Sequence, residues 1–259
     1  NSPANFTASK MKWVLDNEPE IGSAIYKMML PGNFIAMKMT GQILSTVSGM
    51  SECVMWDFEN KKIGNALLDY FGINKDWIPE VQSTFDTHGR VSLMVARELG
   101  LPPNIPISYM AGDQPNNAMS LGVLSPGEAA ATGGTSGVVY AVTDHLVSDA
   151  SGRVNAFAHV NHSDDQNRIG VLLCINGCGI QYAWLRKQMS SEGTPYQDIE
   201  RMIKDVPPGS EGLRILPFGN GAERMLENAS PGAQINNLQF NRHTQAHVYR
   251  AAIEGIAFS

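Results

Sequence analysis

A carboxylate and a glycine turn edged with hydroxyls are the residues of this sequence best suited to chemistry. Asp113 follows the apolar run 105–110 and Gly112, and the turn Gly133-Gly134-Thr135-Ser136-Gly137 starts twenty residues further on. A carboxylate in hydrogen-bond reach of an alcohol can accept its proton. Glycines let a phosphate approach the backbone, and hydroxyls add donors. The pair therefore suits transfer of a phosphoryl group to an alcohol, which needs positioning and charge stabilisation.

Each feature also has a purely structural explanation. An N-cap role would also explain Asp113, because its carboxylate could accept a backbone N–H of residues 115–117. The glycine turn is explained by an ordinary tight hairpin. It is not a P-loop, because no Lys follows it, and it does not open a helix with a G-x-G-x-x-G pattern. Taken separately, both features favour the structural explanation.

The elements that must position these residues change in character near residue 105. Before it, apolar spacing predicts mostly helices, including one over 19–30 that Pro31-Gly32 is expected to stop. Two later helices are expected to end at Gly72 and Gly100, since glycine is a common C-cap. After it, β-compatible runs predict strands. The predicted strands are 105–110, both sides of the glycine turn, 168–175 and 213–218, and the remaining predicted helices are 7–17, 180–185, 195–206 and 244–259.

Composition limits the classes of function. The 259 residues are 43% hydrophobic with a net charge of -6, enough to bury a large core in one or two domains. No basic run or stripe is present, so a nucleic-acid partner is not expected. The longest apolar runs, such as 169–175, are too short to span a bilayer. We therefore expect a cytoplasmic protein with no membrane partner.

Cysteines and histidines give no diagnostic metal pattern. Three cysteines are an odd and sparse set, which favours reduced thiols over a disulfide or metal site. Zinc ligands could be drawn from the histidines, but no Cys or Glu falls at a diagnostic spacing, so polar surface positions are favoured. The residues concerned are Cys53, Cys174 and Cys178, and the pairs His159-x-x-His162 and His243-x-x-x-His247.

The order of several motifs carries more information than any one of them. The central series resembles that of the sugar kinases of the FGGY family, most closely its xylulokinases, and the similarity is collinear over nearly the whole chain. The central motifs are Ala111-Gly112-Asp113-Gln114, Pro126-Gly127-Glu128 and Thr132-Gly133-Gly134-Thr135-Ser136-Gly137-Val138. The outer ones are Thr7-Ala8-Ser9-Lys10, Pro19-Glu20, Leu30-Pro31, Thr40-Gly41, Trp184-Leu185-Arg186, Gly212-Leu213 and 250–258.

The resemblance implies a fold and an activity. It implies an α/β, actin-like (ribonuclease-H-like) ATPase fold of two domains, here 1–122 and 123–259, with the active site in the cleft between them. It implies an ATP- and Mg²⁺-dependent transferase of xylose metabolism that phosphorylates D-xylulose to D-xylulose 5-phosphate. A kinase for another ketose or polyol (ribulose, fuculose, glycerol) and a non-catalytic sugar- or nucleotide-binding fragment remain as alternatives. Family resemblance also suggests a homodimer.

The resemblance also implies roles for individual residues. Asp113 matches the family's catalytic base, and it is the candidate metal ligand in this chain. Gln114, next to it, is expected to face the sugar. The expected ATP-binding residues are Gly133, Gly134, Thr135, Ser136, Gly177 and Gln181.

The sequence departs from the family pattern in three places. The Asp-x-Gly-Thr turn that opens the family's first domain is absent, as is its later adenosine-contacting glycine segment. Gly-Glu-Arg-Thr-Pro of the family appears here as Gly221-Ala222-Glu223-Arg224-Met225. We therefore expect that this sequence is a piece of a longer chain, and that the piece alone binds ATP weakly and turns over negligibly.

Overall fold

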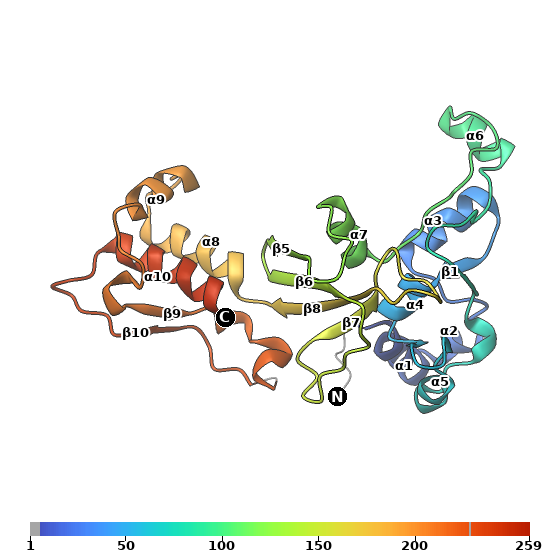
Figure 1. Ribbon diagram of the computed structural model, residues 1–259, viewed down its shortest axis with the longest axis horizontal. Coiled ribbons are helices and arrows are strands. Elements are labelled where there is room, and N and C mark those ends of the chain that lie inside the picture. The colour runs from blue at the N-terminus through green and yellow to red at the C-terminus, as the bar shows by residue number, and fades with distance from the viewer. Residues whose placement is uncertain (1–5, 228) are drawn as a thin grey trace. The chain divides into compact units, whose positions relative to one another are not determined.

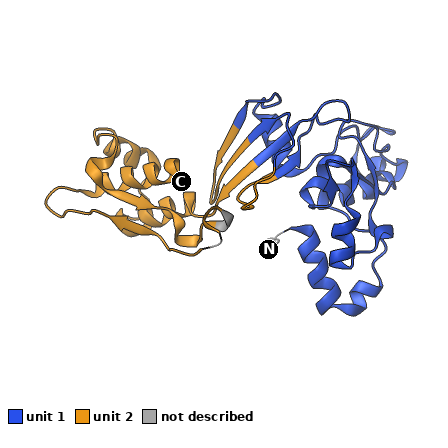
Figure 2. Ribbon diagram, turned by 60° about the horizontal axis from the view of Figure 1, so that its bottom comes forward, with its two compact units in different colours: residues 1–129, 141–147, 156–171 blue, residues 130–140, 148–155, 172–259 orange. Residues whose placement is uncertain are grey.

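Segments far apart in the sequence make up each of two units in the computed structural model, which describes residues 6–227 and 229–259. The first unit takes the chain up to Ala129 together with 141–147 and 156–171 (Figure 2). The second takes 130–140, 148–155 and 172–259. Figure 1 labels the elements of both.

Helices dominate the first unit, as the apolar spacing of its sequence predicts. Its core contains Met50 and Cys53, both wholly buried, packed with Met55 and Leu68. Thioether side chains suit such a core because they fill irregular gaps. The helices are α1 (Thr7–Asn17), α2 (Pro19–Ser23), α3 (Pro31–Thr40), α4 (Val47–Glu52), α5 (Asn65–Phe71), the 3₁₀ helix η1 (Lys75–Trp77), α6 (Leu93–Leu99) and α7 (Asp113–Ser120).

Short strands lie among these helices. Strands β1 (Leu44–Thr46) and β4 (Glu80–Gln82) pair in parallel, and β2 (Trp56–Asp57) pairs antiparallel with β3 (Lys62–Ile63). The predicted helix ends at Gly72 and Gly100 are confirmed, because both glycines are left-handed C-caps, with φ of 69° and 67°.

Two predicted elements of this unit are wrong. The helix expected over 19–30 is only α2, and Pro31 begins α3 instead of stopping a helix. Proline lacks an N–H and has a fixed φ, both of which suit the first helical position. Residues 105–110 are extended but form no named strand. They pair irregularly with 88–91, for example through the Ile107 N–H and the Gly89 carbonyl at 2.9 Å, and Pro106 cannot donate to a ladder.

A four-stranded sheet in the order β5-β6-β8-β7 carries the glycine turn. Strands β5 (Ala129–Gly133) and β6 (Gly137–Thr143) flank the turn, as predicted, and β8 (Ile169–Ile175) confirms the strand expected over 168–175. Strand β7 (Asn155–Ala158) lies at the other edge. The division between the two units falls within all four strands (Figure 2).

The rest of the second unit packs helices on a two-stranded antiparallel sheet. Helix α10 begins at a capping box formed by Thr244 and His247, and it contacts α8, α9 and β9. The predicted strand and the helices predicted over 195–206 and 244–259 are confirmed with shorter ends, whereas the helix predicted over 180–185 extends further at both ends. The elements are α8 (Cys178–Met189), α9 (Tyr196–Ile203), η2 (Ser210–Gly212), β9 (Arg214–Leu216), η3 (Phe218–Asn220), η4 (Glu223–Leu226), β10 (Gln234–Asn236) and α10 (Gln245–Phe258).

Tyr249 is the largest fully buried side chain of this core. Its hydroxyl lies 2.6 Å from Ser190 Oγ and donates to the Leu185 carbonyl at 3.3 Å. We expect Tyr249→Phe to lower the free energy of unfolding by about 1–3 kcal/mol, because it leaves buried polar groups without this partner. Urea unfolding measures the change. Tyr70→Phe is the matched control, since Tyr70 is 81% exposed, and an equal loss there would contradict the prediction.

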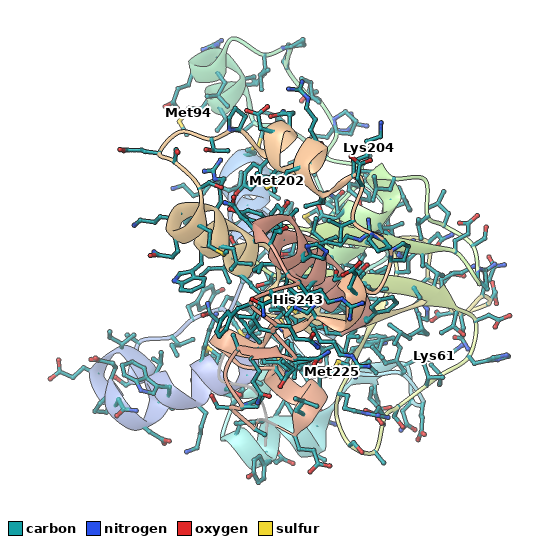
Figure 3. All side chains as sticks on the ribbon, turned by 90° about the vertical axis from the view of Figure 1, so that its left-hand side faces the viewer. Lys61, Met94, Met202, Lys204, Met225 and His243 are labelled. Atoms are coloured by element: carbon teal, nitrogen blue, oxygen red, sulfur yellow. The ribbon has the colours of Figure 1, made fainter. Side chains whose placement is uncertain are left out.

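Each histidine that was considered as a zinc ligand has a hydrogen-bond partner in the backbone. His159 Nε2 lies 3.0 Å from the Val123 carbonyl, and His162 Nδ1 accepts from the Arg168 N–H. His243 (labelled in Figure 3) accepts from the Gln239 N–H, and His247 accepts from the Thr244 N–H. Among the described residues, no three His, Cys, Asp or Glu side chains group as metal ligands would.

The thiols of Cys53 and Cys178 are free and buried, and burial raises the pKa of Cys53 to about 11. In the part of the chain that the structure describes, we find no helix of the length and apolarity needed to cross a membrane.

Candidate active site

Asp113 is the first residue of helix α7, and Gly112 is its N-cap. Because Gly112 and not Asp113 occupies the N-cap position, the N-cap explanation of this residue is wrong. The carboxylate is exposed, and it lines a cavity of about 640 Å³ in the first unit. Gln114 follows it and is half-buried. The geometry leaves the carboxylate available to a ligand in that cavity.

Helix α4 holds the start of α7 with two side chains. Ser48 Oγ accepts the Gly112 N–H at 3.1 Å. The two carboxylate oxygens of Glu52 accept the N–H groups of Asp113 and Gln114, each at 3.2 Å. The first N–H groups of a helix have no partner within the helix, and a carboxylate is favourable there. Glu52 thus supplies from a distant segment the cap that Gly112 cannot.

Glu52 is the residue that sequence reasoning missed. Its pKa is raised to about 7, first because burial disfavours the charged form and second because the charge of Asp113 is close. The hydrogen bonds from the N–H groups of Gln114 and Asp113 act in the opposite direction. Nothing in the local pattern around Glu52 signals this role, since its partners follow 61 and 62 residues later in the chain.

The cavity around Asp113 is largely apolar with a few polar groups. Leu30, Ile35 and Met39 contribute apolar lining. Its polar and titratable members are Asn33, Thr46, Glu52, Tyr109, Asp113 and Asn116. Tyr109 donates its hydroxyl proton to Asn116 Oδ1 at 2.8 Å, which fixes two of them against each other. Few, well-placed polar groups in a mainly apolar cavity are typical of small-molecule sites.

The glycine turn of the second unit is a tight hairpin between β5 and β6, as its purely structural explanation predicts. Gly134 N–H donates to the Ser136 carbonyl at 3.0 Å. The turn is also tied to the first turn of α8, where the N–H groups of Gly179 and Ile180 donate to the carbonyls of Gly134 and Thr135 at 3.0 and 3.2 Å. A Cβ on Gly179 would lie 2.0 Å from the Gly134 oxygen. The hairpin therefore has a fixed backbone partner in α8.

A second cavity, of about 290 Å³, lies along the first turns of α8. Gly177 and Gln181 both line it, together with Ile180, Trp184, Gly219, Asn220 and Ala233. Both polar ends of the Gln181 amide are buried without a hydrogen-bond partner among the described residues. A buried amide in that state costs free energy, and a polar ligand in this cavity would offset it.

The structure therefore divides the predicted site residues between the units. Asp113 and Gln114 lie in the first unit, whereas Gly133, Gly134, Thr135, Ser136, Gly177 and Gln181 lie in the second. The division into domains at residues 122 and 123 stays a prediction. Within the loop that departs from the family pattern, the side chains of Glu223 and Arg224 lie outside the described residues.

Comparison with known proteins identifies sugar kinases. Residues 3–120 match the FGGY family of carbohydrate kinases, N-terminal domain. A xylulose kinase of Lactococcus lactis is 28% identical over 254 residues, covering 98% of this chain and 49% of the relative. A xylulose kinase of Staphylococcus epidermidis is 30% identical, covering 98% and 50%, and a gluconokinase of Bacillus subtilis is 25% identical, covering 97% and 50%. The chain spans about half the length of the curated relatives it matches.

Solved structures agree with this result at the level of the fold. Xylulose kinase from Rhodospirillum rubrum has a TM-score of 0.88 at 22% identity, covering 98% of this chain and 50% of that one. Plasmodium falciparum glycerol kinase with ADP has a TM-score of 0.83 at 23% identity, covering 97% and 50%. The actin-like ATPase fold of such kinases is therefore confirmed for this chain, while the cleft between two domains stays a prediction.

Proposed function

We propose that this chain, whose residues 3–120 match the N-terminal domain of the FGGY family of carbohydrate kinases, belongs to a protein that phosphorylates D-xylulose with ATP to give D-xylulose 5-phosphate. The observation that carries the proposal is the position of Asp113, at the start of α7 and in a cavity of about 640 Å³. The names of its relatives from Lactococcus lactis and Staphylococcus epidermidis support the substrate.

In the proposed reaction, Asp113 is the general base. Its carboxylate accepts the proton of the terminal sugar hydroxyl, and the resulting oxygen attacks the γ-phosphorus while the bond from that phosphorus to ADP breaks. Gln114, the residue after Asp113, is proposed to face the sugar. Asn33 and Asn116, which line the same cavity, offer amide groups to the remaining hydroxyls.

The ATP half of the site is proposed to be the hairpin Gly133–Ser136 with Gly177 and Gln181. The unpartnered amide of Gln181 and the hydroxyls of Thr135 and Ser136 support this assignment, because they supply polar partners to a nucleotide. The active site is proposed to lie in a cleft between domains 1–122 and 123–259. The protein is proposed to act in the cytoplasm as a homodimer.

Mg²⁺ is the proposed metal ion, with Asp113 as its candidate protein ligand. Mg²⁺ is usually held by one or two carboxylates and substrate phosphates, and the exposed Asp113 carboxylate offers one such group. When bound, it would neutralise charge on the phosphates.

A kinase for a different sugar or polyol is the second candidate. The gluconokinase of Bacillus subtilis and the glycerol kinase structure among the comparisons favour keeping it. Coupled detection of ADP, with D-xylulose, ribulose, fuculose, glycerol and gluconate as acceptors for the intact protein, tests both. A preference for another acceptor would overturn the assignment of D-xylulose. Turnover of none of them would favour a non-catalytic binding protein.

Gly133→Ala tests the proposed approach of phosphate to the hairpin. A Cβ at Gly133 would meet no atom within 4 Å in the protein itself, so we expect unchanged thermal stability. We expect ATP affinity to fall about tenfold, because a methyl group would stand where a phosphate approaches the backbone, and a factor of ten is about 1.4 kcal/mol. Calorimetric titration with ATP measures it. Unchanged affinity would contradict the role of Gly133.

A further inference from the structure

The N-terminal turn of α7 is held by one face of α4. Ser48 and Glu52 are four residues apart, so they project from the same side of that helix. Between them they accept three consecutive backbone N–H groups, those of residues 112, 113 and 114. This arrangement fixes the backbone on both sides of the Asp113 Cα.

Close packing makes the contact specific. A Cβ built on Gly112 would lie 2.1 Å from Cδ of Glu52, so the carboxylate fits only because residue 112 has no side chain. Helix α4 is itself well anchored: Thr46 caps it through the Gly49 N–H at 3.1 Å, and Met50 is wholly buried. Ser48 and Glu52, which we call the clamp, therefore project from a fixed element.

Helix α7 needs an external clamp. It has eight residues, of which only Pro115 and Ala118 are buried, and helices this short are marginal by themselves. Its N-cap residue supplies no side-chain hydrogen bond. Without Ser48 and Glu52, the orientation of the Asp113 side chain relative to the cavity would be poorly fixed.

The clamp carries a free-energy cost. A cap that was needed only for stability could avoid that cost. A serine or asparagine at position 112 would cap the helix locally. Instead a half-buried carboxylate from a distant helix lies against the backbone of a residue that carries a second carboxylate, Asp113. Asp113, Glu52 and Tyr109 are the titratable groups that line this cavity, and Cys53 follows Glu52 in the chain.

We propose that Glu52 is a positioning residue for Asp113, holding the first turn of α7 so that the base meets the sugar hydroxyl in the cavity. The inference rests on the proposed kinase function and deepens it. Glu52 acts through Asp113, whose backbone N–H it accepts. Misplacing a reacting group by about 1 Å can cost about 100-fold in rate, which sets the expected size of the effect.

The test is a double-mutant cycle in the intact protein. Glu52→Gln is expected to lower kcat about 100-fold with the KM for ATP unchanged, because a side-chain amide offers one acceptor oxygen where two are needed. In an Asp113→Asn background, the same change is expected to have no further effect on kcat, since residues that act as a unit are not additive. A merely structural role would give equal losses in both backgrounds, and that result would overturn the proposal.

Glu128→Gln is the matched control. The Glu128 carboxylate also accepts two consecutive N–H groups, from Leu124 and Ser125 at 2.7 and 2.8 Å, and it too belongs to the first unit. It is expected to keep full kcat. If Glu52→Gln does not fold, Glu52→Asp replaces it. Its side chain is too short to reach both N–H groups, so the same outcome is expected.

The proposed function and the positioning role fail in different ways. If the unchanged protein phosphorylates no sugar, the kinase function is overturned. If the unchanged protein is active and Glu52→Gln retains full kcat, only the positioning role is overturned. Amide hydrogen exchange at residues 113 and 114 gives a readout independent of activity: faster exchange in Glu52→Gln than in Glu128→Gln supports the clamp, and equal exchange overturns it.

Discussion

Asp113→Asn in the intact protein is expected to lower kcat for sugar phosphorylation by about 10²- to 10⁴-fold, the usual contribution of a general base. Asparagine has nearly the same shape but cannot take the proton of the attacking hydroxyl. Asp113 is the first residue of α7 and not its N-cap, so the change removes no N-cap side chain from the helix. The KM for ATP is expected to change much less than kcat, because the proposed protein contacts to the nucleotide itself come from other residues.

The measurement is steady-state kinetics with the preferred acceptor of the sugar screen, together with thermal unfolding of each variant. Asp198→Asn is the control, since Asp198 also lies in the first turn of a helix and its carboxylate pairs with the exposed Arg201 at 3.0 Å. Full activity in Asp113→Asn would remove Asp113 from the role of base. A large drop in unfolding temperature would assign the loss of activity to the fold instead.

The parts of the site that could be predicted are those with local signals. Asp113 comes directly after a glycine at the end of an extended run, and the hairpin 133–137 has a composition that few turns share. Both lie in the segments where the sequence predicts them. Gly177 and Gln181 are four residues apart on the start of one helix, and both line the second cavity.

Contacts between distant segments could not be predicted in the same way. In the sequence Glu52 only follows the small polar stretch 45–51, and its partners lie 61 and 62 residues further on. A carboxylate cap is normally sought within the first turn of its own helix, so a cap supplied by α4 leaves no trace in the sequence around α7. The error at Pro31 has another cause. Proline marks both helix starts and helix stops, and which applies depends on the chain that follows.

Gly179→Ala is expected to damage both the fold of the second unit and the proposed nucleotide half of the site. Its Cβ would lie 2.0 Å from the carbonyl oxygen of Gly134 and 2.8 Å from that residue's carbonyl carbon. Both are backbone atoms, so no rotamer change relieves the clash. The hairpin or α8 must move by about 1 Å or more, and overpacking of this kind costs about 1–3 kcal/mol or more in stability. The hydrogen bond from the Gly179 N–H, now 3.0 Å, would be stretched with it.

ATP titration and thermal unfolding of the same variants separate the two effects of this change. Gly179→Ala is expected to lower both the unfolding temperature of the second unit and the affinity for ATP. The affinity should fall about tenfold or more, and each factor of ten corresponds to about 1.4 kcal/mol. Gly133→Ala should lower only the affinity. Gly64→Ala should lower neither, because its Cβ would make only ordinary contacts, the nearest at 3.7 Å. If Gly179→Ala binds ATP as tightly as the unchanged protein, the hairpin held by α8 is not the phosphate site.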